Sequence, residues 1–201
     1  MFDWNEILDF WFGPLDDDGL PETAYRRRWF RSDRRFDQEL RRRFLSMVLF
    51  ASEHGLEHWR RHAGGALAEI LLLDQFSRNI FRGVALAFDQ DRQARQLCQQ
   101  AMRKGFDMAL PPVQRAFLYM PLQHSEREDD QALAVECYTQ LVASTEGPLA
   151  ELMKDFQASA EAHQDLIRRF RRFPHRNKAL GRRSTPEEEA YMASGGARFG
   201  Q

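Results

Sequence analysis

The 201-residue chain has few cysteines and no long apolar run. Its two cysteines, Cys98 and Cys137, are far apart and lie within helical patterns, which indicates buried thiols rather than a disulfide framework or a zinc site. The apolar run at residues 70–73, like every other in the chain, is too short to cross a bilayer, and the first residues lack the basic and apolar regions of a secretory signal. We therefore expect a cytoplasmic protein that makes no membrane contact.

The chain also lacks an excess of charge of either sign, because 29 basic residues nearly balance 30 acidic ones. Proteins that bind nucleic acid normally have a basic excess or a basic face, so nucleic acid is an unfavoured partner. The arginine-rich segments 26–43 and 168–183 would restore that candidate only if they formed one basic face. The shares of hydrophobic residues, 43%, and charged residues, 29%, are ordinary for a globular protein.

No stretch alternates apolar and polar residues as a half-buried strand does, whereas apolar residues recur at three- and four-residue steps along most of the chain. Gly/Pro pairs such as Gly13-Pro14 and Gly147-Pro148 separate these segments. We predict a single all-α domain over residues 1–201, with about eight to ten helices and a surface tail at 195–201. The expected arrangement is antiparallel helix pairs in a tetratricopeptide-like α-solenoid or bundle, although no repeat signature of about 34 residues is found.

Three helix starts are marked by capping residues. Asp3 with Glu6, and Thr185 with Glu188, have the spacing of a capping box, in which each side chain satisfies a backbone amide of the other residue. Ser32 is expected to cap the helix that contains the arginine-rich segment 41–43.

The helix expected over residues 66–81 is the most apolar of the chain and should be central. Its second half nevertheless has a polar stripe, since Asp74, Arg78 and Arg82 share one face, with Gln75 and Asn79 beside them. A buried helix with such a stripe needs partners for it. Those partners are either other side chains or a ligand.

The loop expected over residues 170–185 is the second unusual stretch. It interleaves phenylalanines with arginines, His175 and Asn177, whereas linkers are usually rich in Gly and Ser or uniformly charged. Planar donors beside aromatic rings suit either a buried polar lock or an anion-binding pocket.

Three groups of residues together resemble one bacterial family, the domain of unknown function numbered 924. They are Leu-Leu-Leu-Asp-Gln-Phe-Ser-Arg-Asn-Ile-Phe-Arg at 71–82, His-Ser-Glu at 124–126, and Arg-Phe-Pro-His-Arg-Asn at 172–177 with Leu-Gly-Arg at 180–182 and Ser-Thr-Pro-Glu-Glu at 184–188. The resemblance runs from residues 10–12 to Phe199. It implies a helical, tetratricopeptide-like fold and no established activity. At Arg171 the resemblance leads us to expect glycine, whose absence could alter the backbone of the loop.

Our leading hypothesis is a pocket for a small anionic or carboxylate-bearing ligand. Arginines would donate charge-assisted hydrogen bonds, amides would orient the ligand, and Trp11 and Phe173 would supply apolar wall. The candidate ligand-binding residues are Asp74, Gln75, Arg78, Asn79, Arg82, His124, Glu126, His163, His175, Arg176, Asn177 and Arg182.

An enzyme is an alternative, most plausibly a hydrolase. His124 or His175 would be the general base, and Glu126 or Asp74 would orient it. Ser125 and Ser184 are conceivable nucleophiles, although neither lies in a nucleophile-elbow motif. A metal-dependent version would use His124, Glu126, His163 and His175, but no ligand pair at a typical spacing supports it. We therefore predict no metal and no cofactor.

Two non-catalytic alternatives also stand. The polar residues of the two unusual stretches could form a structural lock that fixes the C-terminal loop on the helical core. The protein could instead be a scaffold that binds a protein or peptide on a concave helical surface, an idea that rests on fold analogy alone.

Overall fold

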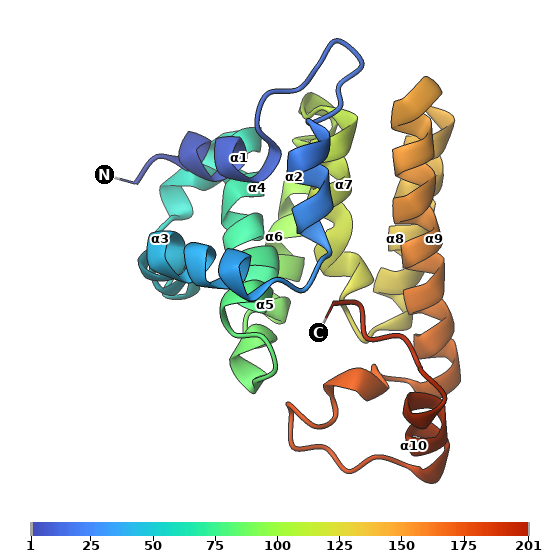
Figure 1. Cartoon of the computed structure of the whole chain (residues 1–201). Coiled ribbons are helices and arrows are strands. Elements are labelled where there is room, and N and C mark those ends of the chain that lie inside the picture. The colour runs from blue at the N-terminus through green and yellow to red at the C-terminus, as the bar shows by residue number, and fades with distance from the viewer. Residues whose placement is uncertain (1, 201) are drawn as a thin grey trace.

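The computed structural model describes residues 2–200 and consists of helices joined by short connections (Figure 1). Within these residues there is no β-strand, and a single isolated bridge joins Leu15 and Pro21. The all-α prediction is confirmed, whereas the tetratricopeptide-like pairing of helices stays a prediction. No helix among the described residues combines the length and apolar character that a membrane span requires.

The helices run through the whole described chain. In order they are α1 (Trp4–Phe12), α2 (Thr23–Trp29), α3 (Arg34–Ser52), α4 (Ala63–Ile70), α5 (Ser77–Ile80), α6 (Asp91–Arg103), α7 (Pro112–Gln123), α8 (Glu128–Ala143), α9 (Gly147–Phe170) and α10 (Pro186–Ala193). A π-helical turn, Leu71–Phe76, connects α4 to α5, and short 3-10 helices lie at Glu57–Arg61, Ala85–Ala87, Asp107–Ala109 and Pro174–Arg176.

Of the two capping boxes predicted from sequence, the one at Thr185 and Glu188 forms, whereas at α1 only Asp3 caps the helix and Glu6 instead accepts from Arg43. The Asp3 carboxylate accepts a hydrogen bond from the amide of Asn5 and so caps α1. At α10, Thr185 Oγ1 accepts from the Glu188 amide, and the Glu188 carboxylate accepts from the Thr185 amide, which completes a capping box. Both helices therefore begin where local side-chain chemistry satisfies their first amides.

The prediction that Ser32 caps α3 is wrong. Asp33 is the capping residue, and its carboxylate accepts from the amides of Arg35 and Phe36 at 2.8 and 3.3 Å. A carboxylate at this position also interacts favourably with the positive end of the helix dipole, which a hydroxyl does not. These two hydrogen bonds lower the pKa of Asp33 below its ordinary value.

Most of the apolar side chains form one large core dominated by aromatic rings. Trp11 is fully buried within it, with ring centroids 5.3 Å from Phe76 and 5.7 Å from Phe117. The prediction that Trp11 lines a ligand pocket is therefore not met, because contacts with these aromatic neighbours from α7 and the π turn enclose it.

A second, smaller core lies at the C-terminal end of α9. It contains Leu166, Ile167 and Phe173, with Phe170 and Tyr191 packed at its edge. In Figure 1 the loop that follows α9 and α10 lies below the main helical body, and the last residues return towards α2 and α7. Side chains that lie between the two cores form the site described below.

The residue that ends α9 has an unusual backbone conformation. Arg171 has a φ of 63° and lies in the left-handed region, with its amide donating to the Ile167 carbonyl. A left-handed residue is the common way to end a helix, and glycine adopts it without steric cost. Glycine is the residue that the family resemblance leads us to expect here. The arginine keeps the turn, at a cost of roughly 1–2 kcal/mol.

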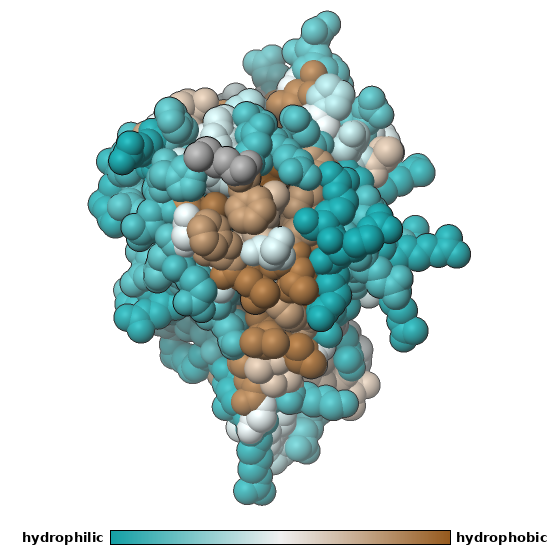
Figure 2. Space-filling view, turned by 90° about the vertical axis from the view of Figure 1, so that its left-hand side faces the viewer, coloured by the Kyte–Doolittle hydropathy of each residue, from teal (hydrophilic) through white to brown (hydrophobic). Residues whose placement is uncertain are grey.

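An apolar patch ringed by polar residues lies on the face of the molecule shown in Figure 2. α1 and α3 lie on that side of the molecule (Figure 1). On α3, Leu49 and Phe50 are 52% and 46% exposed, and the Phe2 ring packs against Phe50. This exposed apolar surface can serve as a control site when apolar binding is tested elsewhere on the protein.

Candidate functional site

The site is built on an irregular turn in a buried helix. Leu71–Phe76 forms a π-helical turn between α4 and α5, and such turns are frequent at functional sites. The turn contains Asp74 and Gln75, which are 0% and 6% exposed. Polar side chains this deeply buried need hydrogen-bond partners.

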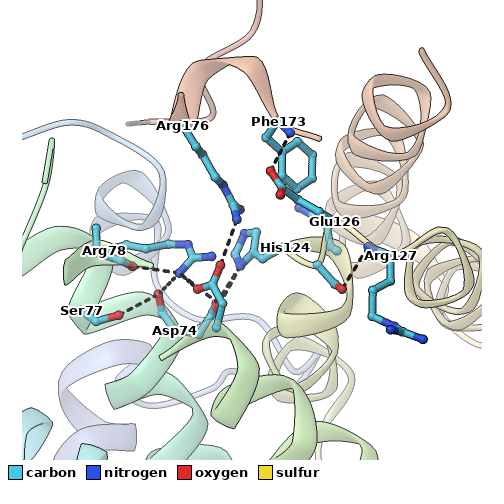
Figure 3. A network of polar contacts seen from close by, with 12 residues as sticks. Asp74, Ser77, Arg78, His124, Glu126, Arg127, Phe173 and Arg176 are labelled. Atoms are coloured by element: carbon cyan, nitrogen blue, oxygen red, sulfur yellow. Dashed lines mark hydrogen bonds and ion pairs between the residues drawn. The ribbon is translucent and has the colours of Figure 1, made fainter. Parts of the chain in front are cut away.

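Asp74 is held by side chains from two helices (Figure 3). His124 at the end of α7 donates from Nδ1 to Asp74 Oδ1 and Oδ2 at 2.7 and 3.0 Å, and Gln75 Nε2 donates to Oδ2 at 2.6 Å. The Arg78 guanidinium lies 3.5 Å from Oδ1. Burial alone would raise the pKa of Asp74, but the charge of Arg78 and these hydrogen bonds lower it below its ordinary value. Asp74 is therefore a carboxylate at neutral pH.

His124 is a neutral imidazole with a fixed tautomer. Burial lowers its pKa below the ordinary value even though Asp74 acts in the opposite direction. A carboxylate only accepts hydrogen bonds, so the proton of the ring lies on Nδ1 and the lone pair on Nε2. That lone pair makes Nε2 of His124 an acceptor for a hydrogen bond or a proton.

Asp91, the first residue of α6, connects two arginines from distant parts of the chain. Arg78 Nη1 donates to Asp91 Oδ1 at 2.7 Å, and Arg176 Nη1 donates to Oδ2 at 2.9 Å. In Figure 3 Arg176 extends from the C-terminal segment towards Arg78 and His124. The Arg176 guanidinium also lies over the rings of Phe88 and Phe173, 4.8 and 4.5 Å from their centroids. Burial lowers the pKa of Arg176 to about 10, so it remains charged at neutral pH.

Arg78, His124 and Arg176 border a cavity of about 200 Å³, which we call the polar cavity. Its lining combines arginine, histidine and amide side chains with aromatic rings. The polar members are Arg31, Gln75, Arg78, Asn79, Arg82, Gln123, His124, Ser159, His163, His175 and Arg176, and the apolar members include Trp29, Phe30, Phe88, Met120 and Phe199.

Several buried polar atoms of the cavity lining have no hydrogen-bond partner within the described part of the chain. They are Nη2 of Arg78, Nε of Arg176, Nδ1 of His175 and Oε1 of Gln123. Arg78 and Arg176 are only 6% and 5% exposed. A buried donor without an acceptor costs about 1–3 kcal/mol, and more when the group is charged. Two arginines of the cavity lining thus keep buried donors that the described chain leaves without acceptors.

One edge of the cavity is closed by satisfied contacts. Arg82 donates from Nε and Nη2 to the Asp37 carboxylate at 2.8 and 2.9 Å, and from Nη2 to Asn79 Oδ1 at 2.6 Å. Its Nη1 contacts the Gly200 carbonyl. Arg82 is therefore fixed in place and has little capacity for a ligand.

Two further histidines lie beside the C-terminal tail. His163 donates from Nδ1 to the Ser159 carbonyl at 2.7 Å, and its ring stacks on Phe199 with centroids 3.6 Å apart. Burial lowers the pKa of His163 well below its ordinary value. Burial, followed by the charge of Arg176, lowers the pKa of His175 to about 3. Both rings are therefore neutral at pH 7.

A second polar cluster lies outside the cavity, and we call it the C-terminal network. It consists of Glu126, Arg172, Asn177, Arg182 and Glu188. Arg182 makes two hydrogen bonds to the Glu126 carboxylate at 2.7 and 2.9 Å and one to Asn177 Oδ1 at 3.0 Å. Figure 3 shows Glu126 also accepting from the amide of Phe173, at 2.8 Å.

The other half of this network is centred on Glu188, which is 2% exposed. Arg172 donates to both of its oxygens at 2.6 and 2.7 Å, and Asn177 and the Thr185 amide donate to Oε2 at 3.2 and 2.8 Å. The hydrogen bonds from Arg172 are the main reason that the pKa of Glu188 falls to about 2. No member of the C-terminal network has a buried polar atom without a partner among residues 2–200.

The twelve residues proposed from sequence thus divide into separate groups. Gln75, Arg78, Asn79, Arg82, His124, His163, His175 and Arg176 line the cavity. Asp74 lies behind His124 and holds it, while Glu126, Asn177 and Arg182 belong to the C-terminal network. Phe173, proposed as apolar wall, packs in the smaller core and against Arg176 rather than lining the cavity.

Sequence reasoning missed Asp91, whose carboxylate connects Arg78 and Arg176. In sequence it is one acidic residue among several near the start of a predicted helix, where acidic residues are common for helix stability alone. The aromatic lining from Trp29, Phe30 and Phe88 was missed for a similar reason, because isolated aromatic residues in helical patterns usually belong to a core.

The proposed serine nucleophiles have other partners. Ser125 Oγ donates to Asp130 at 2.7 Å, and Ser184 Oγ accepts from Asn177 at 3.1 Å. Among residues 2–200 no group of three or more histidine, cysteine or acidic side chains is arranged to hold a metal ion. Within the described residues, neither serine hydroxyl is hydrogen-bonded to His124 or His175.

Comparison with known proteins gives a family but no activity. The model of the family described as "Bacterial protein of unknown function (DUF924)" matches residues 7–196. A solved structure of a protein of unknown function from Agrobacterium tumefaciens is similar at a TM-score of 0.80 and 36% identity, over 95% of this chain and 97% of that one. No curated protein matches the chain in sequence.

Proposed function

The chain belongs to the DUF924 family of bacterial proteins, and we propose that its polar cavity binds a small carboxylate-bearing ligand. One observation supports this most strongly: Arg78 and Arg176 line the cavity, are almost fully buried, and each keep a buried nitrogen without a partner in the described chain. A ligand carboxylate would accept from such donors through short, charge-assisted hydrogen bonds.

The geometry of the arginine pair also fits a planar carboxylate ligand. Asp91 is shared by Arg78 and Arg176, so the two guanidinium groups have one strongly bound carboxylate between them. Asp74 is nearer to His124 than to Arg78, which it approaches only to 3.5 Å. Because His124 is neutral, the carboxylates of Asp74 and Asp91 balance the charges of the two guanidinium groups. A ligand carboxylate would therefore bind through the directed N–H groups of the arginines, whose planar geometry it matches.

The remaining lining suits recognition of an organic carboxylate rather than a bare ion. Neutral His124 and Gln123 offer acceptors and donors, and Phe88 and Phe199 supply apolar surface. Ligand pockets typically combine a few oriented polar groups with aromatic walls in this way.

Binding can be tested by calorimetry with a panel of small mono- and dicarboxylates. We expect at least one to bind the wild type and to bind Arg176→Met at least about tenfold more weakly, because a charged hydrogen bond contributes about 1.5–3 kcal/mol. Arg127→Met is the matched control, since Arg127 is near His124 in sequence but its side chain is 63% exposed and does not line the cavity. Equal affinity for wild type and Arg176→Met would refute the proposal.

A second candidate function is hydrolysis with His124 as the general base. His124 is favoured over His175 as the base, because His124 donates hydrogen bonds to Asp74 whereas His175 has no carboxylate partner among the described residues. Asp74 would orient the ring and stabilise its protonated form, and Nε2 would activate a water molecule.

This candidate predicts a specific loss of rate. In a screen of ester and amide substrates, any activity should fall about 10²–10⁴-fold in His124→Gln and strongly in Asp74→Asn. His175→Gln should retain most of it, because His175 is not oriented by a carboxylate. Activity that survives in His124→Gln would exclude His124 as the base.

A tetratricopeptide-like arrangement, and with it a scaffold for a protein or peptide, would be supported if a peptide library bound to the protein and competed with the carboxylate. The buried free thiols of Cys98 and Cys137 are compatible with a reducing, cytoplasmic setting.

A further inference from the structure

A second hollow adjoins the polar cavity, and its character is different. We call it the apolar groove; it has a volume of about 370 Å³ and lies among α2, α7 and α9. Its apolar wall consists of Trp29, Phe30, Met120, Leu152 and Phe156. A hollow of this size and lining is typical of sites for small organic molecules.

The groove and the polar cavity share part of their lining. Trp29, Phe30, Met120 and Ser159 line both of them. These four side chains therefore lie where the two hollows adjoin. A single molecule that extends past Phe30 would lie in both.

Phe30 marks the junction and is unusually exposed. It is 56% exposed, although its ring lies 5.7 Å from Phe156 and 6.1 Å from Phe117. An exposed aromatic ring at the mouth of a cavity leaves apolar surface in water, and covering that surface with an apolar ligand would be favourable.

We infer that the ligand is an amphipathic carboxylate, with its head at Arg78 and Arg176 and its apolar body in the groove beyond Phe30. This inference rests on the proposed function, since the arginines would bind the head. The groove itself offers no charged group as deeply buried as those arginines: the charged residues that line it are Arg26, Arg27 and Asp155, and Arg27 and Asp155 are exposed. A linear aliphatic or an aromatic body would both satisfy this chemistry.

The test is calorimetric titration with straight-chain carboxylates from acetate to decanoate, each below its aggregation concentration. Each methylene that enters the groove should tighten binding by up to about fourfold. We expect octanoate to bind at least about 50-fold more tightly than butanoate, with the gain ending once the chain extends beyond the groove.

Variants connect this gain to the groove. Leu152→Asp places a charge in the groove at a partly buried position, and should weaken octanoate at least about tenfold while leaving butanoate within about twofold. Leu49→Asp is the matched control, because Leu49 belongs to the exposed apolar surface of α3, and it should leave both affinities unchanged. Circular dichroism melting confirms that each variant is folded.

The outcomes separate this inference from the proposed function. If octanoate binds no more tightly than butanoate, or if Leu49→Asp weakens it as much as Leu152→Asp does, the groove does not hold the ligand body. Arg176-dependent butanoate binding would then still support the proposed function. If octanol binds the wild type as tightly as octanoate, the groove acts without the arginines and the joined site is refuted. Absence of binding by every carboxylate would refute both.

Discussion

The polar cavity and the C-terminal network use the same residue types, arginines with carboxylates and amides, and they meet at consecutive residues, Arg176 and Asn177. In the network, each buried polar atom has a partner, and Arg182 uses Nε, Nη1 and Nη2. In the cavity, Arg78 and Arg176 each keep a buried nitrogen without a partner among the described residues.

The difference shows how buried charges with similar composition can serve different purposes. A satisfied network fixes one arrangement of its elements, here the loop after α9 against the α7–α8 connection and α10. Unsatisfied buried donors contribute no such stability, and a fold that keeps them does so at its own expense, as functional sites often require. Stability measurements on matched variants can therefore tell the two regions apart.

The largest effect is expected in the network. Glu188→Ala should lower the free energy of unfolding by about 3–5 kcal/mol, because it leaves Arg172, Asn177 and the Thr185 amide without their acceptor. Urea denaturation measures this loss. Glu187→Ala is the control: its side chain is 61% exposed and pairs only with Arg169 at the surface, so the change should stay within about 0.5 kcal/mol. A similar loss of unfolding free energy in both variants would show that the buried network contributes no more to stability than an exposed ion pair does.

Arg176→Met should have a much smaller effect on stability. It removes a desolvated cation, while Asp91 keeps Arg78 as a partner, so we expect a change within about 1 kcal/mol or a gain. The same denaturation experiment applies. If the free energy of unfolding fell by about 3 kcal/mol or more, the cavity arginines would be a structural lock. The polar cavity and the C-terminal network would then not differ in their contribution to stability.

The two regions should also respond in different ranges of pH. The pKa of His175 falls from 6.5 to about 3 in the folded protein, so the unfolded chain takes up a proton first as the pH decreases below 6.5. Relative to His175→Asn, the wild type should lose about 1.4 kcal/mol of stability between pH 8 and pH 5.5. A pH-independent difference between the two would show that His175 titrates normally.

Glu188 should act in a lower range. Its pKa falls from 4.5 to about 2, so it stabilises the folded state above pH 4.5, and that stability is lost as the pH decreases towards 2. The difference between wild type and Glu188→Gln should therefore be constant from pH 8 to 5.5 and decrease below about pH 4.5. Urea denaturation of wild type and Glu188→Gln at several pH values measures this difference in the free energy of unfolding. A difference that already decreases between pH 8 and 5.5, where His175 acts, would contradict the prediction.

The smallest effect concerns the residue that leads into the network. Arg171→Gly should raise the free energy of unfolding by about 1 kcal/mol, because glycine adopts the left-handed conformation at this position without strain. The exposed ion pair of Arg171 with Glu128 contributes little against this gain. Arg168→Gly, in the last turn of α9 where the backbone is still helical, should instead destabilise by up to about 1 kcal/mol. If both substitutions destabilise, the strain at Arg171 is not significant.

Helix spacing predicted that Asp74 and Arg78 lie close together on a buried helix, and capping chemistry predicted the start of α10. The single face shared with Arg82 was not predicted correctly, because the π-helical turn interrupts the helix and Arg82 lies beyond the end of α5. The sequence could not show which polar residues line the cavity and which belong to the C-terminal network. Arg176 and Asn177 are adjacent in the chain, yet Arg176 lines the cavity and Asn177 belongs to the network. Their division depends on where Asp91 and Glu188 lie in space, which is decided by packing of helices far apart in the chain.

The π-helical turn at Leu71–Phe76 has a consequence for how the site could have arisen. Each residue of a helix turns the chain by about 100°, so one extra residue within a turn rotates everything after it by that amount relative to what precedes it. Here it allows the helix to direct Ala66, Leu67 and Ile70 into the large core before the turn while Arg78 and Asn79 after it line the polar cavity. Removal of a single residue from the turn would restore a regular helix and rotate the arginine away from Asp91. The length of this turn, as much as the identity of its side chains, therefore determines whether the protein has a site.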